Sequence, residues 1–322
     1  MPPSPSPFVR FAWGTLAFNV AVILWGAYVR ATGSGAGCGN HWPLCNGVVV
    51  PLAPATATVI EFTHRAMTGI DLPLVALLVV WAFRRFPRGH PARLGATLSG
   101  VFLLTEALIG AALVLLERVA RNASAWYTSA HLLNTLTLLA CLALTAWWGA
   151  GETAVRARGR AAWLAGASLL AMALLGVSGA IAALGDTLFP PHSLAEGLAQ
   201  DLNPAASVFV RLRVWHPAIA AVAGLWLLYY AASSGAKKLA WWLMSLVGLQ
   251  VAAGAVNLLL LAPVWMQMLH LLLADLLWIV LVLLCASRLQ VPPAPADRWV
   301  DETGMHSGGL GRAGADPRAA GK

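Results

Sequence analysis

Charged side chains are scarce in this sequence. Only 11% of its 322 residues are Asp, Glu, Lys or Arg, whereas 59% are apolar. Soluble domains carry roughly a quarter charged residues, so this chain has too little charge to cover a large water-facing surface. The composition therefore disfavours an ordinary soluble domain and favours a chain surrounded by lipid.

Soft metal ligands are also scarce, because the chain has only 4 cysteines. Cys38 and Cys45 lie in one loop, where His41 is the only other soft ligand nearby. Structural zinc takes four such ligands, which argues against a zinc site in this loop. Cys141 and Cys285 fall within apolar runs and are predicted to be small buried hydrophobic residues.

Apolar runs dominate the chain, and each is long enough to cross a bilayer, which takes about 20 residues per helix. They lie near 11–29, 58–83, 94–116, 126–148, 161–184, 208–232, 239–261 and 265–287. The chain is therefore predicted to be an all-α polytopic membrane protein with eight transmembrane helices. The first run is long enough to remain as a span, so no cleavable signal peptide is expected.

Basic residues gather in alternate connections between the runs. They are Arg10, Arg84, Arg85, Arg88, Arg93, Arg156, Arg158, Arg160, Lys237, Lys238 and Arg288. The positive-inside rule then puts both termini in the cytoplasm and the chain in the cell membrane. The net charge of +8 is explained by this topology, so no nucleic-acid partner is expected. The loop with Cys38 and Cys45 falls outside, where a disulfide between them would persist.

The second half of the chain repeats the pattern of the first. His270-Leu271-Leu272 in the eighth run echoes His131-Leu132-Leu133 in the fourth, for example. We therefore expect two tandem four-helix bundles related by a pseudo-two-fold axis along the membrane normal. The predicted parts are a cytoplasmic tail (1–10), a first half (11–148) with an outer cysteine loop (30–57), a cytoplasmic linker (149–160), a second half (161–287) and a disordered cytoplasmic tail (288–322).

Histidines occupy matching places in the two halves. His64, His131, His216 and His270 each lie in the outer turns of a predicted span, and ionisable groups at such depth need partners. Facing histidines on two helices can supply the two axial nitrogen ligands of a haem. The pattern predicts one haem between His64 and His131 and another between His216 and His270. A hydrogen-bonding role is the alternative for a single histidine, and isolated histidine pairs fit zinc or copper poorly.

The two halves differ in the charged residue that precedes the histidine. Glu61 lies one turn before His64, whereas Arg213 lies before His216. A carboxylate beside a haem can transfer protons or stabilise a developing cation, so the first half is predicted to be reactive. Arg65, Arg211 and Arg213 are predicted to bind haem propionates. Hydrogen bonding within the bundle is the simpler interpretation for Asp71, Glu106 and Asp275.

Several of these segments resemble the haem A synthase family of bacteria and mitochondria. They are Gly26-Ala27-Tyr28-Val29-Arg30-Ala31-Thr32-Gly33-Ser34-Gly35, the loop Cys38 to Cys45 around Trp42-Pro43, Glu61-Phe62-Thr63-His64-Arg65, His131, Trp215-His216-Pro217 and His270. The resemblance covers about residues 10–287. This chain departs from the family in its cysteine loop, which has Gly39-Asn40-His41 where Pro-Asp is more usual before the tryptophan, and in Glu106, where glutamine is expected.

The resemblance implies a reaction and a division of labour. Haem A synthases oxidise the C8 methyl of haem O to a formyl group through an alcohol and a hydrated aldehyde, making haem A for terminal oxidases. It implies that Glu61 is the catalytic carboxylate, that substrate haem O binds His64 and His131, and that a haem B cofactor binds His216 and His270. It also implies a haem O synthase as partner and an electron donor that the sequence does not identify.

Two other functions fit the histidine pairs. A di-haem b-type electron carrier linked to a quinol would share them, but it needs no catalytic acid such as Glu61. Tandem four-helix repeats also suit a haem transporter, although the lack of broken helices at the bilayer midplane disfavours it. The sequence leaves open whether the chain forms a homo-oligomer.

Overall fold

Eight long helices form the framework of the protein. The computed structural model describes residues 5–116, 125–152, 154–156 and 158–290. The long helices are α1 (Pro7–Ala31), α2 (Thr56–Arg85), α3 (Pro91–Leu115), α4 (Ala125–Gly149), α5 (Gly159–Leu188), α8 (Trp215–Ala232), α9 (Lys237–Leu259) and α10 (Val264–Arg288). Over these ranges the chain has eight segments long and apolar enough to cross a membrane. The predicted all-α, multi-pass membrane fold is confirmed.

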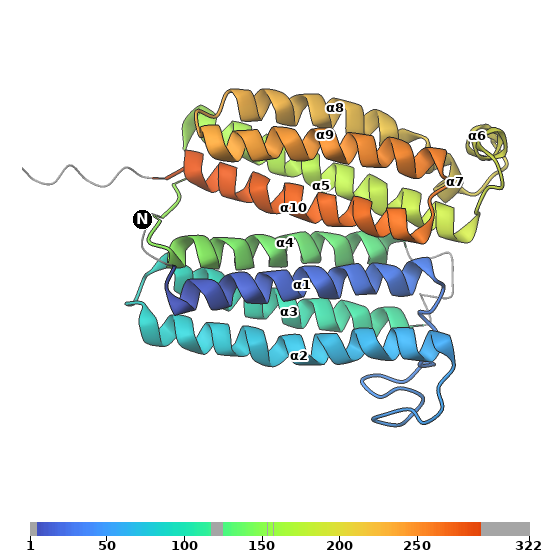
Figure 1. Cartoon of the computed structure of the whole chain (residues 1–322), viewed down its shortest axis with the longest axis horizontal. Coiled ribbons are helices and arrows are strands. Elements are labelled where there is room, and N and C mark those ends of the chain that lie inside the picture. Colours follow the sequence, from blue (N-terminus) through green and yellow to red (C-terminus); the bar gives the residue numbers. More distant parts are fainter. Residues whose placement is uncertain (1–4, 117–124, 153, 157, 291–322) are drawn as a thin grey trace, which may run out of the picture. The chain divides into compact units, whose positions relative to one another are not determined.

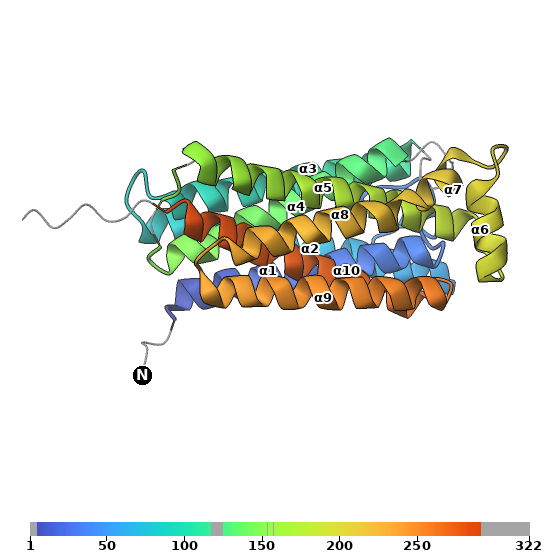
Figure 2. The ribbon, with the colours of Figure 1, turned by 90° about the horizontal axis from the view of Figure 1, so that it is seen from above.

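Two short helices precede α8. Helix α7 (Val208–Arg213) continues almost directly into α8, and together they form the sixth span. Helix α6 (Leu194–Leu202), which the hydrophobic pattern did not predict, lies across the end of the second-half helices (Figure 2). It begins with a capping arrangement in which the Glu196 N–H donates to Ser193 Oγ (3.2 Å) and Glu196 Oε2 accepts from the His192 N–H (2.9 Å).

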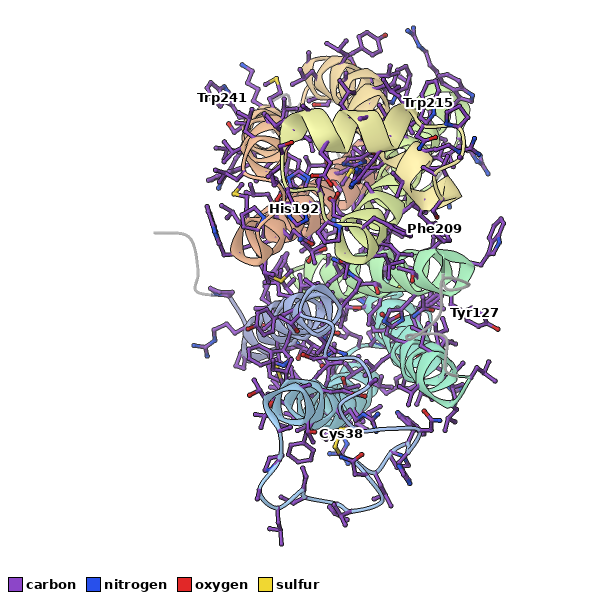
Figure 3. All side chains as sticks on the ribbon, turned by 90° about the vertical axis from the view of Figure 1, so that its right-hand side faces the viewer. Cys38, Tyr127, His192, Phe209, Trp215 and Trp241 are labelled. Carbon is purple, nitrogen blue, oxygen red and sulfur yellow. A yellow bond between two sulfur atoms is a disulfide. The ribbon has the colours of Figure 1, made fainter. Side chains whose placement is uncertain are left out.

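The long helices pack as two groups of four (Figure 1). In the first group α1 contacts α2 and α4, and α3 contacts the same two helices. In the second group α8 lies between α5 and α9, and α10 lies between α9 and α5. Seen from the end that carries α6, the two groups stand side by side, with Cys38 at the edge of the first (Figure 3). The pseudo-two-fold axis remains a prediction.

The first and fourth helices of each group make the contact between the groups. Trp278 of α10 donates its indole N–H to the Leu136 carbonyl of α4 (2.7 Å). Arg30 of α1 donates to the Ala183 carbonyl (2.9 Å) and to Thr187 Oγ1 (3.1 Å), both on α5. Buried leucines of α4 and α10 belong to one continuous apolar core. The two histidine pairs are therefore held in one packed structure rather than in loosely joined parts.

The connection between α2 and α3 shows how a span is ended and restarted. Phe86 leaves the helical conformation, and α3 restarts with Pro91 as its first residue. Pro is favoured there because the first helical N–H has no partner within the helix. His90 caps α3, since its Nδ1 accepts from the Ala92 N–H at 3.2 Å. Of the tail predicted over 288–322, α10 includes Arg288, and the part from residue 291 onward lies outside the described residues.

Candidate functional site

One face of α2 carries the polar residues of the first half. Glu61, His64 and Asp71 are spaced three and seven residues apart, so they lie along one side of the helix. Glu61 is 4% exposed and Asp71 is 1% exposed. Asp71 accepts a hydrogen bond from Asn19 Nδ2 of α1 at 2.9 Å. Burial of carboxylates in an apolar bundle is costly, so the buried carboxylates on this face of α2 are candidates for a functional role.

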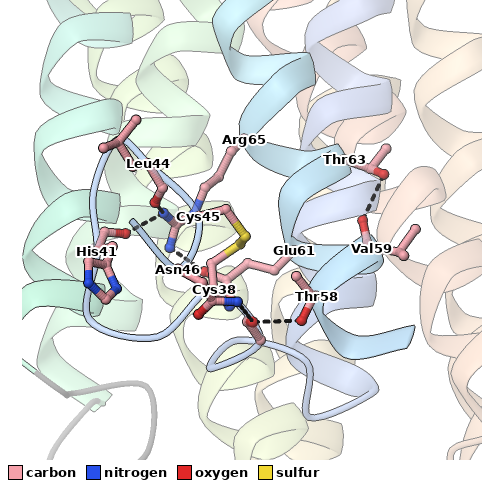
Figure 4. The surroundings of a disulfide bond; sticks show 11 residues. Cys38, His41, Leu44, Cys45, Asn46, Thr58, Val59, Glu61, Thr63 and Arg65 are labelled. Atoms are coloured by element: carbon pink, nitrogen blue, oxygen red, sulfur yellow. Dashed lines mark hydrogen bonds and ion pairs between the residues drawn. A yellow bond between two sulfur atoms is a disulfide. The ribbon is translucent and has the colours of Figure 1, made fainter. Parts of the chain in front are cut away.

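The Glu61 carboxylate is held at both oxygens. Its Oε2 accepts from the backbone N–H of Cys38 at 2.8 Å, and its Oε1 pairs with the Arg65 guanidinium at 2.5 Å (Figure 4). Arg65 also donates to the carbonyl oxygens of His41 and Leu44. Charge-assisted hydrogen bonds of this kind are the strong ones in proteins. They attach the cysteine loop to α2 at the residue that was predicted to be catalytic.

The cysteine loop itself is closed by a disulfide. Cys38 and Cys45 are bonded at 2.03 Å, and both are buried, which confirms the predicted pairing. The loop lies so close to α2 that a Cβ on Gly37 would meet the Ala57 carbonyl oxygen at 2.4 Å. Thr58 Oγ1 donates to the Gly37 carbonyl at 2.8 Å. Glycine is therefore required at position 37 for the loop to cover the start of α2.

The structure places the four histidines two by two, and their ligation of haem remains a prediction. His64 on α2 lies within electrostatic range of His131 on α4, and His216 on α8 lies within range of His270 on α10. In each half the pair joins the second and fourth long helices. Figure 1 places the starts of all four helices at the end of the molecule that carries α6 and the cysteine loop. Each histidine lies within the first nine residues of its helix, so all four belong to this end of the bundle.

The ring nitrogens have few protein partners. The Nδ1 atoms of His64 and His270 are buried without a hydrogen bond among the described residues, whereas His131 Nδ1 lies 3.3 Å from Glu106 Oε1. His216 differs, because its Nδ1 lies 2.9 Å from Ser178 Oγ. Buried polar atoms are normally paired. The unpaired Nδ1 atoms of His64 and His270 therefore suit an added ligand, one in each half.

Glycines of neighbouring helices make room for three of the imidazoles. A Cβ on Gly26 would lie 2.8 Å from His64 Cε1, and one on Gly179 would lie 3.0 Å from His216 Cε1. A Cβ on Gly254 would likewise lie 3.1 Å from the Cε1 of His270. Distances this short require a shift of the ring, so these positions favour glycine. Glycine at these positions lets His64, His216 and His270 lie close to the neighbouring helix.

The arginines predicted to bind propionates have different surroundings. Arg213 is 8% exposed and pairs with Asp186 of α5 (2.9 Å) and Asp201 of α6 (2.6 Å). These carboxylates already take up much of its hydrogen-bonding capacity. Arg211 is exposed and contacts the Pro204 carbonyl at 3.4 Å. The propionate role of both residues remains a prediction, and the contacts of Arg213 favour a role in holding α6.

Some residues of the site were not found from the sequence. Asp186, Asp201 and α6 enclose Arg213, and Arg30 of α1 also reaches Gln267 of α10 at 3.4 Å. The Ser193 and Glu196 capping signature was a signal for α6 that hydrophobicity alone does not reveal. The partner of Arg30 depends on how the two groups of helices dock, which no local pattern specifies.

The fold and site define a class of protein: a multi-pass helical membrane protein with two pairs of partly buried histidines on its second and fourth long helices in each half. Comparison with known proteins then identifies the family. The COX15-CtaA family, described as cytochrome oxidase assembly protein, matches residues 9–282, and the chain belongs to this family.

Three relatives of known name are similar in sequence to this chain. A Thermus thermophilus protein named "Protoheme IX farnesyltransferase" is 50% identical over 300 residues, which cover 89% of this chain and 49% of that protein. "Heme A synthase" of Shouchella clausii is 45% identical over 93 residues, 29% of this chain and 31% of that protein. "Heme A synthase" of Halalkalibacterium halodurans is 39% identical over 125 residues, 38% of this chain and 42% of that protein. The chain thus spans about half the length of its Thermus relative.

Proposed function

We propose that the protein is a haem A synthase, an oxidoreductase that converts the C8 methyl of haem O to a formyl group. The observation that carries the proposal is the buried Glu61 carboxylate one turn before His64, on the face of α2 that also carries Asp71. Membership of the COX15-CtaA family and the relatives named "Heme A synthase" support it. A simple electron carrier would not need this acid.

Substrate haem O would bind in the first half (11–148), with His64 and His131 as its axial ligands. Two differences between the halves support this choice. Glu61 precedes His64, whereas the counterpart Arg213 is engaged by two aspartates. In addition, a Cβ added to Gly110 of α3 would meet no other described atom within 4 Å. A Cβ added to its counterpart Gly254 would lie 3.1 Å from His270 Cε1. A more open wall suits a haem that must enter and leave.

The residues around Glu61 would position and protect the reaction. The Glu61 carboxylate would accept a proton from the carbon substituent being oxidised, or stabilise positive charge that develops on it. Arg65 and the Cys38 N–H would hold the carboxylate in place. The disulfide-closed loop would limit access of water from the outer side. His64 and His131 would orient the macrocycle so that its methyl group faces Glu61.

A haem B cofactor would bind in the second half (161–287), between His216 and His270. A haem of this type supplies one-electron transfer. His216 would be oriented by Ser178 through the nitrogen that does not face the iron.

The proposed partner is a haem O synthase, which makes the substrate. The Thermus relative supports this link, because this chain matches half of a protein whose name is that of a protohaem farnesyltransferase. The protein would lie in the cell membrane with both termini in the cytoplasm. Arg84 and Arg85 at the end of α2 and Arg288 at the end of α10 support this orientation.

The proposal is tested by expressing the chain with a haem O synthase in a host that makes no haem A. Membrane haems would be extracted and separated by chromatography for the wild type, Glu61→Ala and His64→Ala. Haem A should form in the wild type and be lost in both variants. Unchanged haem O in the wild type, with bound haem B and a working respiratory chain, would contradict the proposal and favour the electron carrier.

A further inference from the structure

The Glu106 carboxylate of α3 lies beside the ring of His131. Its Oε1 is 3.3 Å from His131 Nδ1, and its side chain is 17% exposed. Its Oε2 accepts from Asn134 Nδ2 at 2.5 Å, and its Oε1 accepts from the Thr135 hydroxyl. Two donors on α4 therefore fix the carboxylate against the imidazole that α4 also carries. Because ionised carboxylates only accept hydrogen bonds, this set of donors suits the anionic form.

The corresponding helix of the second half has a neutral side chain beside its histidine, at the other ring nitrogen. Gln250 of α9 points its Nε2 at His270 Nε2, 3.3 Å away. The Gln250 Oε1 is buried without a hydrogen bond among the described residues. In the predicted repeat α9 and α10 correspond to α3 and α4. The first half thus has a carboxylate at Nδ1 of His131, and the second half has a neutral amide at Nε2 of His270.

We propose that Glu106 is a positioning residue that lowers the reduction potential of the haem held by His131, relative to the haem held by His270. This inference rests on the proposed function, because it assumes that both histidines ligate haem iron. The Nδ1 of His131 faces Glu106, which leaves Nε2 as the nitrogen for iron. A carboxylate partner on the other ring nitrogen fixes the tautomer and makes the ligand more basic. A more electron-rich ligand stabilises ferric iron over ferrous iron.

The direction of electron transfer follows from this difference. His216 and His270 would hold a haem that can accept single electrons, and Glu106 would make a haem held by His131 the better electron donor of the two. The transfer is downhill when the second haem has the higher potential. Glu106 would thus bias the pair toward carrying electrons away from the half that contains Glu61.

A purely structural role for Glu106 is the competing explanation, since it also joins α3 to α4. The two roles differ in what they change. Loss of an interhelix contact would lower stability without a specific effect on one haem. Loss of the charge would raise the potential of the first-half haem alone. Replacing Glu106 with glutamine keeps the shape and hydrogen bonding of the side chain but removes the charge, and reproduces the residue found in the second half.

The test is a spectroelectrochemical titration of the purified, haem-loaded protein. The wild type, Glu106→Gln and Gln250→Glu would be compared. The redox transition that is absent from the titration of His64→Ala would be assigned to the first-half haem. Second-shell partners of metal ligands typically change affinity by about tenfold or more. A tenfold change in the preference for ferric iron is about 59 mV for one electron. Glu106→Gln should therefore raise the first potential by that order, and Gln250→Glu should lower the second.

Two results would overturn the inference in distinguishable ways. If both haems bind with low-spin spectra and neither potential moves in its variant, the role of Glu106 is wrong while the proposed function stands. If the purified wild type holds no bis-histidine haem, the inference and the proposed function both fail. The reciprocal Gln250→Glu variant keeps the test decisive should Glu106→Gln fold poorly.

Discussion

Substitution of the glycines that lie against the histidines tests whether the positions of these imidazoles determine haem binding. In Gly26→Ala the new Cβ would lie 2.8 Å from His64 Cε1 and 3.1 Å from its Nε2. Contacts this close force the imidazole away from its place. Overpacking of this kind costs roughly 1–3 kcal/mol. At 1.4 kcal/mol per tenfold, haem should bind roughly 5- to 140-fold more weakly in the first half.

The same helix offers a matched control. Gly14 has no other atom within 4 Å of an added Cβ, so Gly14→Ala changes the helix propensity of α1 without touching a histidine. In the second half Gly179→Ala, at 3.0 Å from His216 Cε1, is matched by Gly166→Ala, which meets nothing. Alanine raises the intrinsic helix propensity by about 1 kcal/mol in each case, so the difference within each pair reports the contact with the imidazole.

The assay is haem loss from the purified protein to an excess of apomyoglobin, followed by absorption. Gly26→Ala should release the first-half haem faster than both the wild type and Gly14→Ala. Gly179→Ala should do the same for the second-half haem. Equal rates of haem loss for Gly26→Ala and Gly14→Ala would show that His64 does not ligate haem from its position beside α1. The proposed first-half haem site would then be wrong.

Three other contacts give measurable outcomes. Asn19→Ala should lower the free energy of unfolding in detergent by roughly 1–3 kcal/mol, because it removes the donor to the buried Asp71 carboxylate; an unchanged midpoint would contradict this. Arg213→Ala should cost roughly 3 kcal/mol by leaving two carboxylates unpaired, and limited proteolysis should then cleave near α6, whereas Arg211→Ala should resist cleavage like the wild type. Burial lowers the pKa of His90 below its ordinary value, and the cap needs the unprotonated Nδ1. The stability that His90 adds over His90→Ala should therefore be present at neutral pH and disappear as the pH falls through this lowered pKa, and a difference that is constant with pH would refute the capping role.

Much of the membrane framework could be predicted from the sequence, because each span leaves a long apolar run of its own. The run at 58–83 became α2, and the run at 94–116 became α3, each within a few residues. The disulfide followed from the compartment of its loop. The prediction that Glu106 would be hydrogen-bonded within the bundle is confirmed by Asn134 and Thr135. These features depend on local composition or on helical spacing.

Other features depend on packing between distant segments and had no local signal. The Cys38 N–H reaches Glu61 only because the loop folds back on α2, with Gly37 in close contact. Arg213 was predicted to face a propionate, but its neighbours Asp186 and Asp201 come from α5 and from the unpredicted α6. Ion pairs between residues far apart in the sequence depend on how the helices pack. The local sequence pattern could therefore identify the charged residues but not their partners.

The haem content of two histidine variants tests the central claim most directly. The wild type, His64→Ala and His216→Ala would be purified from cells that also make haem O. Chromatography would identify the bound haems, and the amount of each haem would be divided by the protein concentration. We expect His64→Ala to keep haem B and to lose haem O and haem A, and we expect His216→Ala to lose haem B. Loss of the same haem in both variants, or the reverse assignment, would contradict a substrate site in the first half and a cofactor site in the second.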